Sequence, residues 1–230
     1  MIQHFLSLWS PLDWFALALF LAGWVFYAYT ADLAARSATG LRGVTHLRRL
    51  EWAREMTQRE NRITDASLIG DLKASVSFYA NATIYIIAGL LAVAGTLERV
   101  ASFTEELPFA RQTSRELLEA KMFVLIGIFI FAYFKFTWSL RQFNFLSILL
   151  GATPPKGSAS DVLERAAERF ALMSSLAGDE FNRGIRAYYF GFAILGWFVH
   201  PALFIALTLT ILAVLWRRDF MSHTLRAMSD

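Results

Sequence analysis

Few side chains in this sequence are arranged as catalytic chemistry requires. The chain has no cysteine, which excludes disulfides, thiolate metal sites and thiol catalysis. It also lacks a His-Glu-x-x-His zinc motif, a Gly-x-Ser-x-Gly nucleophile turn, a Walker loop and a Gly-x-Gly-x-x-Gly dinucleotide motif. Adjacent acids such as Asp179 and Glu180 point in different directions on a helix, so we interpret them as solvated charge. We therefore expect no enzyme activity, no metal site and no cofactor.

Two ionisable residues lie within apolar sequence, where a charge is costly. A charge at the centre of a bilayer costs at least about 2.5–3.5 kcal/mol. The stem of Lys135 either carries its charge to the headgroups, or the charge faces a polar cavity or a subunit interface. His200 precedes Pro201, which frees a backbone carbonyl one turn earlier. The imidazole either satisfies that carbonyl or serves in proton relay, ion coordination or haem ligation.

A further set of polar residues borders the apolar segments. Four of them are arginines that we expect near one level, where they would form an electropositive vestibule for small anions or anionic lipid headgroups. The alternative is simple anchoring of the chain to anionic lipid. The candidate polar residues are Asn61, Arg62, Arg141, Asn182, Arg183, Arg186 and Tyr189, in addition to Lys135 and His200.

Four apolar segments must position these residues. The chain is 56% hydrophobic and only 18% charged, whereas soluble domains are about 25% charged, and about 20 apolar residues span a bilayer. The segments cover residues 12–30, 75–97, 122–140 and 187–216. The third is expected to continue beyond Leu140. The fourth is too long for one straight span and contains Pro201, so it must tilt, kink or break into two half-helices.

Two stretches between the apolar segments have the pattern of amphipathic helices. Residues 41–74 and 160–178 both place apolar residues at helical spacing among charged ones, and a Pro-Pro break precedes the second. We expect them to lie on the membrane or to pack on a partner helix. The sequence therefore predicts an all-α fold, a membrane bundle of four transmembrane helices with two amphipathic cytoplasmic segments, forming one domain over residues 1–230.

The distribution of Lys and Arg predicts the orientation. Residues 31–75 carry eight and residues 141–186 carry six, against none before the first span, four in 98–121 and three at the C-terminal end. The positive-inside rule places both long loops in the cytoplasm, here of a bacterial inner membrane. Residues 1–11 lack the basic start of a signal peptide, so we expect a retained first helix with its N-terminus outside. With four true spans the C-terminus is also outside, whereas it is cytoplasmic if the segment at Pro201 turns back instead of crossing.

Several stretches, taken in order, are similar to a known family. They are Glu60–Ser67, Phe134–Gln142, Phe181–Phe190, Trp197–Pro201 and Arg217–Phe220. Over roughly residues 10–225 the chain resembles the domain-of-unknown-function 599 family, multi-pass membrane proteins of bacteria and plants. The resemblance implies the topology and gives no activity. It directs attention to family-like residues at the cytoplasmic helix ends: Asn61, Arg62, Ser139, Arg141, Asn182, Arg183, Arg186, Tyr188 and Tyr189.

Two functions from different classes follow. The first is an oligomeric channel or transporter for a small anion or lipid headgroup, because small residues from Ala74 to Gly95 favour a homo-oligomer and anionic lipids suit the arginines. The alternative is a scaffold or assembly factor that docks a partner through the amphipathic helices. A polar path would favour transport, whereas a closed, Phe-filled interior and an exposed apolar groove would favour a scaffold. A lipid enzyme is least supported, and acids interleaved with the basic residues speak against nucleic acid.

Overall fold

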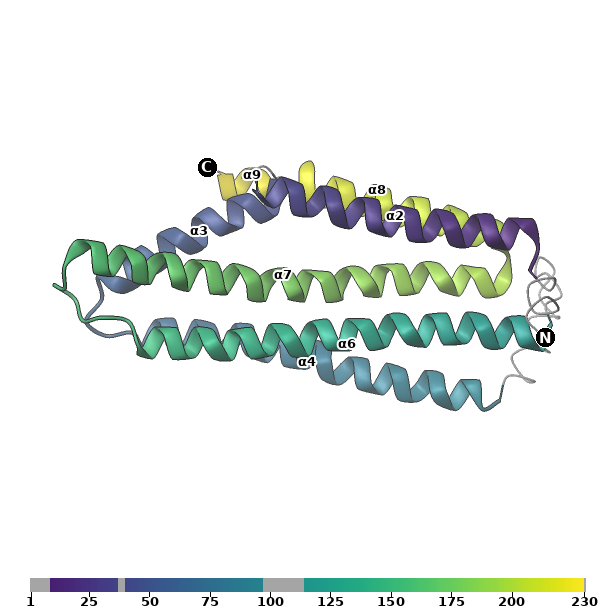
Figure 1. Cartoon of the computed structure of the whole chain (residues 1–230), viewed down its shortest axis with the longest axis horizontal. Helices are drawn as coiled ribbons and strands as arrows, with labels where there is room; N and C mark the ends of the chain where they lie inside the picture. Colours follow the sequence, from purple (N-terminus) through teal and green to yellow (C-terminus); the bar gives the residue numbers. More distant parts are fainter. Residues whose placement is uncertain (1–8, 37–39, 97–113, 230) are drawn as a thin grey trace. The chain divides into compact units, whose positions relative to one another are not determined.

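Every element that the structure describes is a helix, which confirms the all-α class (Figure 1). The computed structural model describes residues 9–36, 40–96 and 114–229. In chain order the helices are α2 (Pro11–Arg36), α3 (Gly40–Thr57), α4 (Ile63–Ala94), α6 (Arg115–Gly151), α7 (Ser160–Val199), α8 (Pro201–Phe220) and α9 (His223–Ser229).

Four helical stretches are long and apolar enough to cross a membrane. They are Pro11–Leu33, Ile63–Ala94, Arg115–Gly151 and Pro201–Ser229. The first three contain most of the expected spans. With 37 residues at about 1.5 Å each, α6 is about 55 Å long, so it continues beyond Leu140 as predicted and exceeds a hydrocarbon core of about 30 Å.

The fourth apolar segment is two helices, which corrects the expected single span over residues 187–216. Helix α7 ends at Val199 and α8 begins at Pro201. A proline ring fits the first turn of a helix and not its interior, so the helix breaks before it. The His200 Nδ1 atom accepts a hydrogen bond from the Ala202 backbone N–H at 3.1 Å, a capping contact at the start of α8. This contact is structural, but it differs from the expected one, because the imidazole accepts from a backbone N–H of α8 and does not satisfy a carbonyl one turn earlier.

The chain divides into two compact units, each described here by itself. The first unit is Met1–Thr30, Thr83–Ala132 and Ile185–Trp216, and the second is Ala31–Ala82, Tyr133–Gly184 and Arg217–Asp230.

Aromatic rings fill the interior of the first unit around the C-terminal half of α7. Phe190 and Trp197 are fully buried. The Trp24 ring stacks on Phe190 with centroids 4.8 Å apart, and Phe20 packs against both Phe190 and Phe204. Such ring contacts pack densely and leave little space between helices.

Helices α7 and α8 form an antiparallel hairpin in the first unit. Near the turn, the Trp197 ring stacks on Phe204 at 5.0 Å. At the other end of the hairpin, the Arg186 guanidinium of α7 lies over the Tyr27 ring. The Tyr27 hydroxyl donates to the Leu215 carbonyl of α8 at 3.5 Å. Figure 1 shows α8 turning back beside α2 after α7 ends. The end of α8 therefore lies at the same end of the first unit as the start of its α7 segment.

In the second unit, α3 packs antiparallel to the N-terminal half of α7. Trp52 meets Phe170 with ring centroids 5.2 Å apart, and Arg54, two residues farther along α3, pairs with Glu164, six residues earlier on α7. Part of the apolar stripe of each amphipathic helix is used here, since Met56 and Phe170 are fully buried. Two predicted boundaries change. Segment 41–74 breaks between α3 and α4, and segment 160–178 continues unbroken to Val199.

Candidate functional site

Seven charged side chains of the second unit form a line in which cations and anions alternate. We call them the charge chain: Lys135, Glu180, Arg183, Asp32, Arg42, Asp179 and Arg49. Lys135 Nζ lies 2.9 Å from Glu180 Oε2, and the other oxygen of Glu180 pairs with Arg183. Asp32 bridges Arg183 at 3.2 Å and Arg42 at 2.5 Å. Arg42 then binds both carboxylate oxygens of Asp179 at 2.8 Å.

Four helices supply the charge chain. Asp32 belongs to the last turns of α2, Lys135 to α6, and Arg42 and Arg49 lie two turns apart on α3. The other three residues come from adjacent turns of α7. The charge chain ranges from partly exposed members such as Asp32 to Arg42 and Glu180, which are about 10% exposed, and each inner member has partners of opposite sign on both sides.

Of the cations in the charge chain, Arg42 is the one paired with two carboxylates from different helices. Its side chain is only 10% exposed. Burial alone would lower the pKa of its guanidinium, but the hydrogen bonds and charges of Asp179 and Asp32 outweigh burial and raise the pKa. Arg42 is therefore a structural cation that holds two acids from different helices together.

Arg49, the last member of the charge chain, lies in a different environment. Its guanidinium lies against Gly178, where an added Cβ would be 2.4 Å from the Nη2 atom. Burial lowers the pKa of Arg49, Asp179 opposes that effect, and the nearby Arg42 adds to it. Among the described residues, no hydrogen bond or ion pair reaches this guanidinium, and Asp179 acts on it only through its charge while its two oxygens bind Arg42. Among these seven described residues, four are cations and three are anions, and Arg49 is the cation without an ion pair.

Further unmatched polar atoms lie at a similar level of the second unit. The Ser139 hydroxyl donates to the Ala177 carbonyl at 2.7 Å, which fixes the antiparallel register of α6 and α7. One turn onward, that register sets Gln142 level with Ser174, and the Gln142 Oε1 and Ser174 Oγ atoms are both buried without a hydrogen-bond partner in the described chain. Ser174 precedes Gly178 by one turn on the same side of α7. Two unmet polar atoms thus lie about one turn of α7 from Gly178, the residue that Arg49 contacts.

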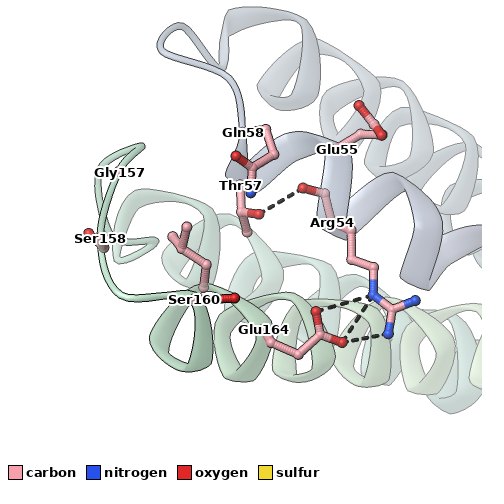
Figure 2. Close-up of a pocket in the computed structure, with 9 residues that line it drawn as sticks. Arg54, Glu55, Thr57, Gln58, Gly157, Ser158, Ser160 and Glu164 are labelled. Atoms are coloured by element: carbon pink, nitrogen blue, oxygen red, sulfur yellow. Dashed lines mark hydrogen bonds and ion pairs between the residues drawn. The ribbon is translucent and has the colours of Figure 1, made fainter.

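A separate polar pocket of about 440 Å³ opens at the other end of α3 (Figure 2). The lining includes Arg54, Thr57, Ser158 and Glu164. Figure 2 shows Arg54 and Glu164 joined by dashed lines, and their closest atoms are 2.5 Å apart. The Thr57 and Ser158 hydroxyls donate to backbone carbonyls at 2.7 Å. Because these groups already satisfy one another, we assign no ligand to this pocket.

Among the described residues, no group of three or more acid or histidine side chains is arranged to hold a metal ion.

The predicted site residues fall into different surroundings. Lys135 and Arg183 belong to the charge chain. Arg62 donates to the carbonyls of Thr153 and Pro154, so it fastens the loop before α7. Arg141 is exposed over the Trp138 ring, whereas Arg186 is buried over the Tyr27 ring. The four arginines expected to share a vestibule therefore have separate partners.

The remaining candidates have more local positions. The Asn61 Oδ1 atom accepts the Ile63 backbone N–H at 2.9 Å and caps α4. Asn182 is half-buried and Tyr189 is at the limit of exposure, at 36%.

Five members of the charge chain were missed by sequence reasoning: Asp32, Arg42, Arg49, Asp179 and Glu180. The interpretation of the last two as solvated charge is wrong. They do point in different directions, but Asp179 meets Arg42 on α3 while Glu180 meets Lys135 on α6. Adjacent acids on a helix packed on two sides can each find a partner.

A second buried polar group was also missed, in the first unit. The Trp197 Nε1–H donates to Asp13 at 2.8 Å, and Lys121 donates to the Trp197 carbonyl at 2.8 Å. Asp13 and Lys121 are each 2% exposed. The signal for them was weak, because each is a single charge at the end of an apolar run.

Comparison with known proteins identifies the family and supplies no activity. No curated protein and no solved structure matches the chain. A family described as "Protein of unknown function, DUF599" matches residues 15–224, which confirms the resemblance seen in the sequence. The match includes every member of the charge chain. The chain therefore belongs to the DUF599 family of multi-pass membrane proteins of unknown function.

Proposed function

We propose that this protein is a membrane-anchored binder of an oxyanion, and that it holds a phosphate or carboxylate group at Arg49 on its cytoplasmic side. The observation that carries the proposal is the uncompensated Arg49 guanidinium beside Gly178. A buried polar group without a partner costs about 1–3 kcal/mol, and more when it is charged, so the half-buried Arg49 guanidinium carries part of that cost. An oxyanion would accept from several Arg49 N–H donors at once, which offsets that cost.

Charge distribution supports the cytoplasmic orientation. Seventeen of the 22 Lys and Arg residues belong to the second unit, and five belong to the first. The hairpin at His200 returns the chain to the end where α2 leaves the first unit, so the basic C-terminal residues join the basic loops. With four plain spans, the basic C-terminal residues would lie on the opposite side from the basic loops. With the hairpin they lie on the same side, so the positive-inside rule favours a cytoplasmic second unit more strongly.

The packing supports binding over the two functions considered from the sequence. Transport needs a polar path, but Phe20, Trp24, Phe190 and Trp197 fill the first unit of a single chain. Docking through the amphipathic helices needs an exposed apolar groove, but Met56 and Phe170 of that face are buried within the second unit, although Leu47 and Leu176 remain exposed.

Self-association remains part of the proposal. The small residues Ala74 and Ala92 of α4 stay exposed on a single chain, and small residues allow close helix packing in a membrane.

Arg49 would recognise an oxyanion group. That group could be the phosphate of a lipid headgroup, or it could belong to free phosphate or to a carboxylate. Two arms of one experiment distinguish them. Purified protein is placed in nanodiscs of neutral phosphatidylcholine with added inorganic phosphate, or in nanodiscs that contain phosphatidylglycerol, and thermal unfolding is followed. A ligand at 100 times its Kd raises the free energy of unfolding by about 2.7 kcal/mol.

Arg49→Gln tests the assignment, with Arg54→Gln as the matched control on the same helix. We expect the ligand-dependent rise in the parent and in Arg54→Gln, and a smaller rise in Arg49→Gln. An Arg49-dependent rise with phosphate identifies a free anion, and one with phosphatidylglycerol alone identifies a headgroup. An equal rise in all three proteins, or none in the parent with either ligand, would overturn the proposal.

A further inference from the structure

The outer face of α6 in the second unit carries a second group of residues with a recognisable chemistry. Positions 134, 138, 141 and 145 are spaced by three or four residues and so lie on one side of the helix. Phe134, Trp138 and Phe145 are 63%, 46% and 38% exposed, and Arg141 is exposed among them. The opposite side of the helix carries the buried residues Phe136 and Phe143.

Arg141 is held between two of these rings. Its guanidinium carbon lies 5.8 Å from the Trp138 ring centre and 5.7 Å from the Phe145 ring centre. Both distances suit a cation–π contact, which orders the side chain without using its N–H donors. No carboxylate pairs with Arg141 in the part of the chain that the structure describes. An ordered cation with available donors is thereby presented on an apolar face.

Depth along the helix indicates what meets this face. Residues 122–140 contain one charge, Lys135, and nineteen residues of helix cover about 28 Å, close to the hydrocarbon thickness of about 30 Å. Trp138 and Arg141 then lie at the boundary. Phe145 lies about 6 Å beyond Arg141, within a headgroup layer of roughly 5–7 Å. Tryptophan and arginine are the residues that favour this boundary.

We propose that Trp138, Arg141 and Phe145 form a surface site for the phosphate and upper acyl chain of an anionic phospholipid. Arg141 binds the phosphate oxygens while the two rings lie against the glycerol and the first acyl carbons. The site is independent of the oxyanion proposed at Arg49, because the two share no residue. The exposed α6 face is thus a contact with the lipid surface and not with a second protein.

Fluorescence quenching by brominated lipids tests the site in the full-length protein. Bromine on the upper acyl carbons of phosphatidylglycerol or of phosphatidylcholine is introduced into mixed nanodiscs, and the contribution of Trp138 is obtained as the difference between the parent and Trp138→Phe. A basic residue at the surface favours anionic lipid by about five-fold. We expect brominated phosphatidylglycerol to quench Trp138 at several-fold lower mole fraction than brominated phosphatidylcholine.

Substitutions separate this site from the one at Arg49. Arg141→Gln is expected to remove the preference for the anionic lipid and keep quenching by both, and Arg49→Gln is expected to leave the preference intact. Equal quenching of the parent by the two lipids, or a preference that survives Arg141→Gln, would refute the site. Absence of quenching at Trp138, with crosslinking of two chains through Phe145→Cys, would show that a second copy covers the face.

Discussion

Two arginines of α3, Arg42 and Arg49, should differ in how replacement by methionine changes the free energy of unfolding. Methionine retains an apolar stem and removes the charge. Arg42 is 10% exposed and neutralises Asp32 and Asp179, whose side chains are 40% and 26% exposed. Removing one partner of a fully buried pair costs about 3–5 kcal/mol. Because both acids are partly exposed and Asp32 retains Arg183, we expect Arg42→Met to lower the free energy of unfolding by about 2–3 kcal/mol.

Arg49→Met should be neutral or stabilising when no ligand is bound. Its guanidinium has no hydrogen-bond or ion-pair partner in the described chain, so the substitution removes a desolvated charge and breaks no contact between partners. A residue kept for binding at some cost to stability behaves in this way. We expect a change within about 0.5 kcal/mol, or a gain.

The assay is thermal unfolding of both variants after removal of lipid, in neutral detergent without phosphate. A loss of about 2–3 kcal/mol in Arg42→Met corresponds to roughly 4–12 °C in Tm for a chain of this size. The reasoning fails if Arg49→Met unfolds as early as Arg42→Met. Arg49 would then be a structural cation, and the case for an oxyanion at that position would be lost.

Three further predictions concern packing, pH and topology. Gly184→Ala should lower the free energy of unfolding by about 1–3 kcal/mol in the same assay, because its Cβ would lie 2.5 Å from a ring atom of the buried Phe136. The Arg54 hydrogen bond lowers the pKa of Glu164 below its usual 4.5, so the pair should stabilise the fold above pH 4.5 and lose that effect as pH falls through the lowered pKa. In an acid titration of the free energy of unfolding, Arg54→Gln should show a smaller loss than the parent. An unchanged profile would count against the pair. Since the chain has no cysteine, single cysteine variants can be labelled directly. An impermeant maleimide should reach Ser229→Cys and Ser160→Cys from one side of the membrane and Ser114→Cys from the other. If Ser229→Cys and Ser114→Cys were labelled from the same side, the hairpin would be excluded.

Much of the fold was predictable from local sequence because the bilayer imposes a simple requirement. A run of about 20 apolar residues must form a helix that satisfies its own backbone, and three spans were recognised on that basis. The break at Pro201 was also foreseen as one of several outcomes. The direction of α8 after the break was not, because it depends on tertiary contacts such as the stacking of Trp197 on Phe204.

The candidate site was only partly predictable, for a physical reason. Lys135 and Arg183 drew attention because they border apolar sequence. Arg42 and Arg49 did not, since they belong to a helix in which charged residues are frequent and look solvated. Whether such a charge is paired, buried or unmatched depends on residues more than 100 positions away, as in the contact between Arg42 and Asp179. No pattern within one helix contains that information.

Native mass spectrometry of the purified protein tests the oxyanion site most directly. Protein stripped of lipid is mixed with phosphatidylglycerol or with inorganic phosphate, and the ligands retained by each chain are counted for the parent, Arg49→Gln and Arg141→Gln. The account predicts that Arg49→Gln retains one ligand fewer than the parent, whether that ligand is phosphatidylglycerol or inorganic phosphate, and that Arg141→Gln loses only the phosphatidylglycerol of its own surface site. Equal retention by Arg49→Gln and the parent would contradict it.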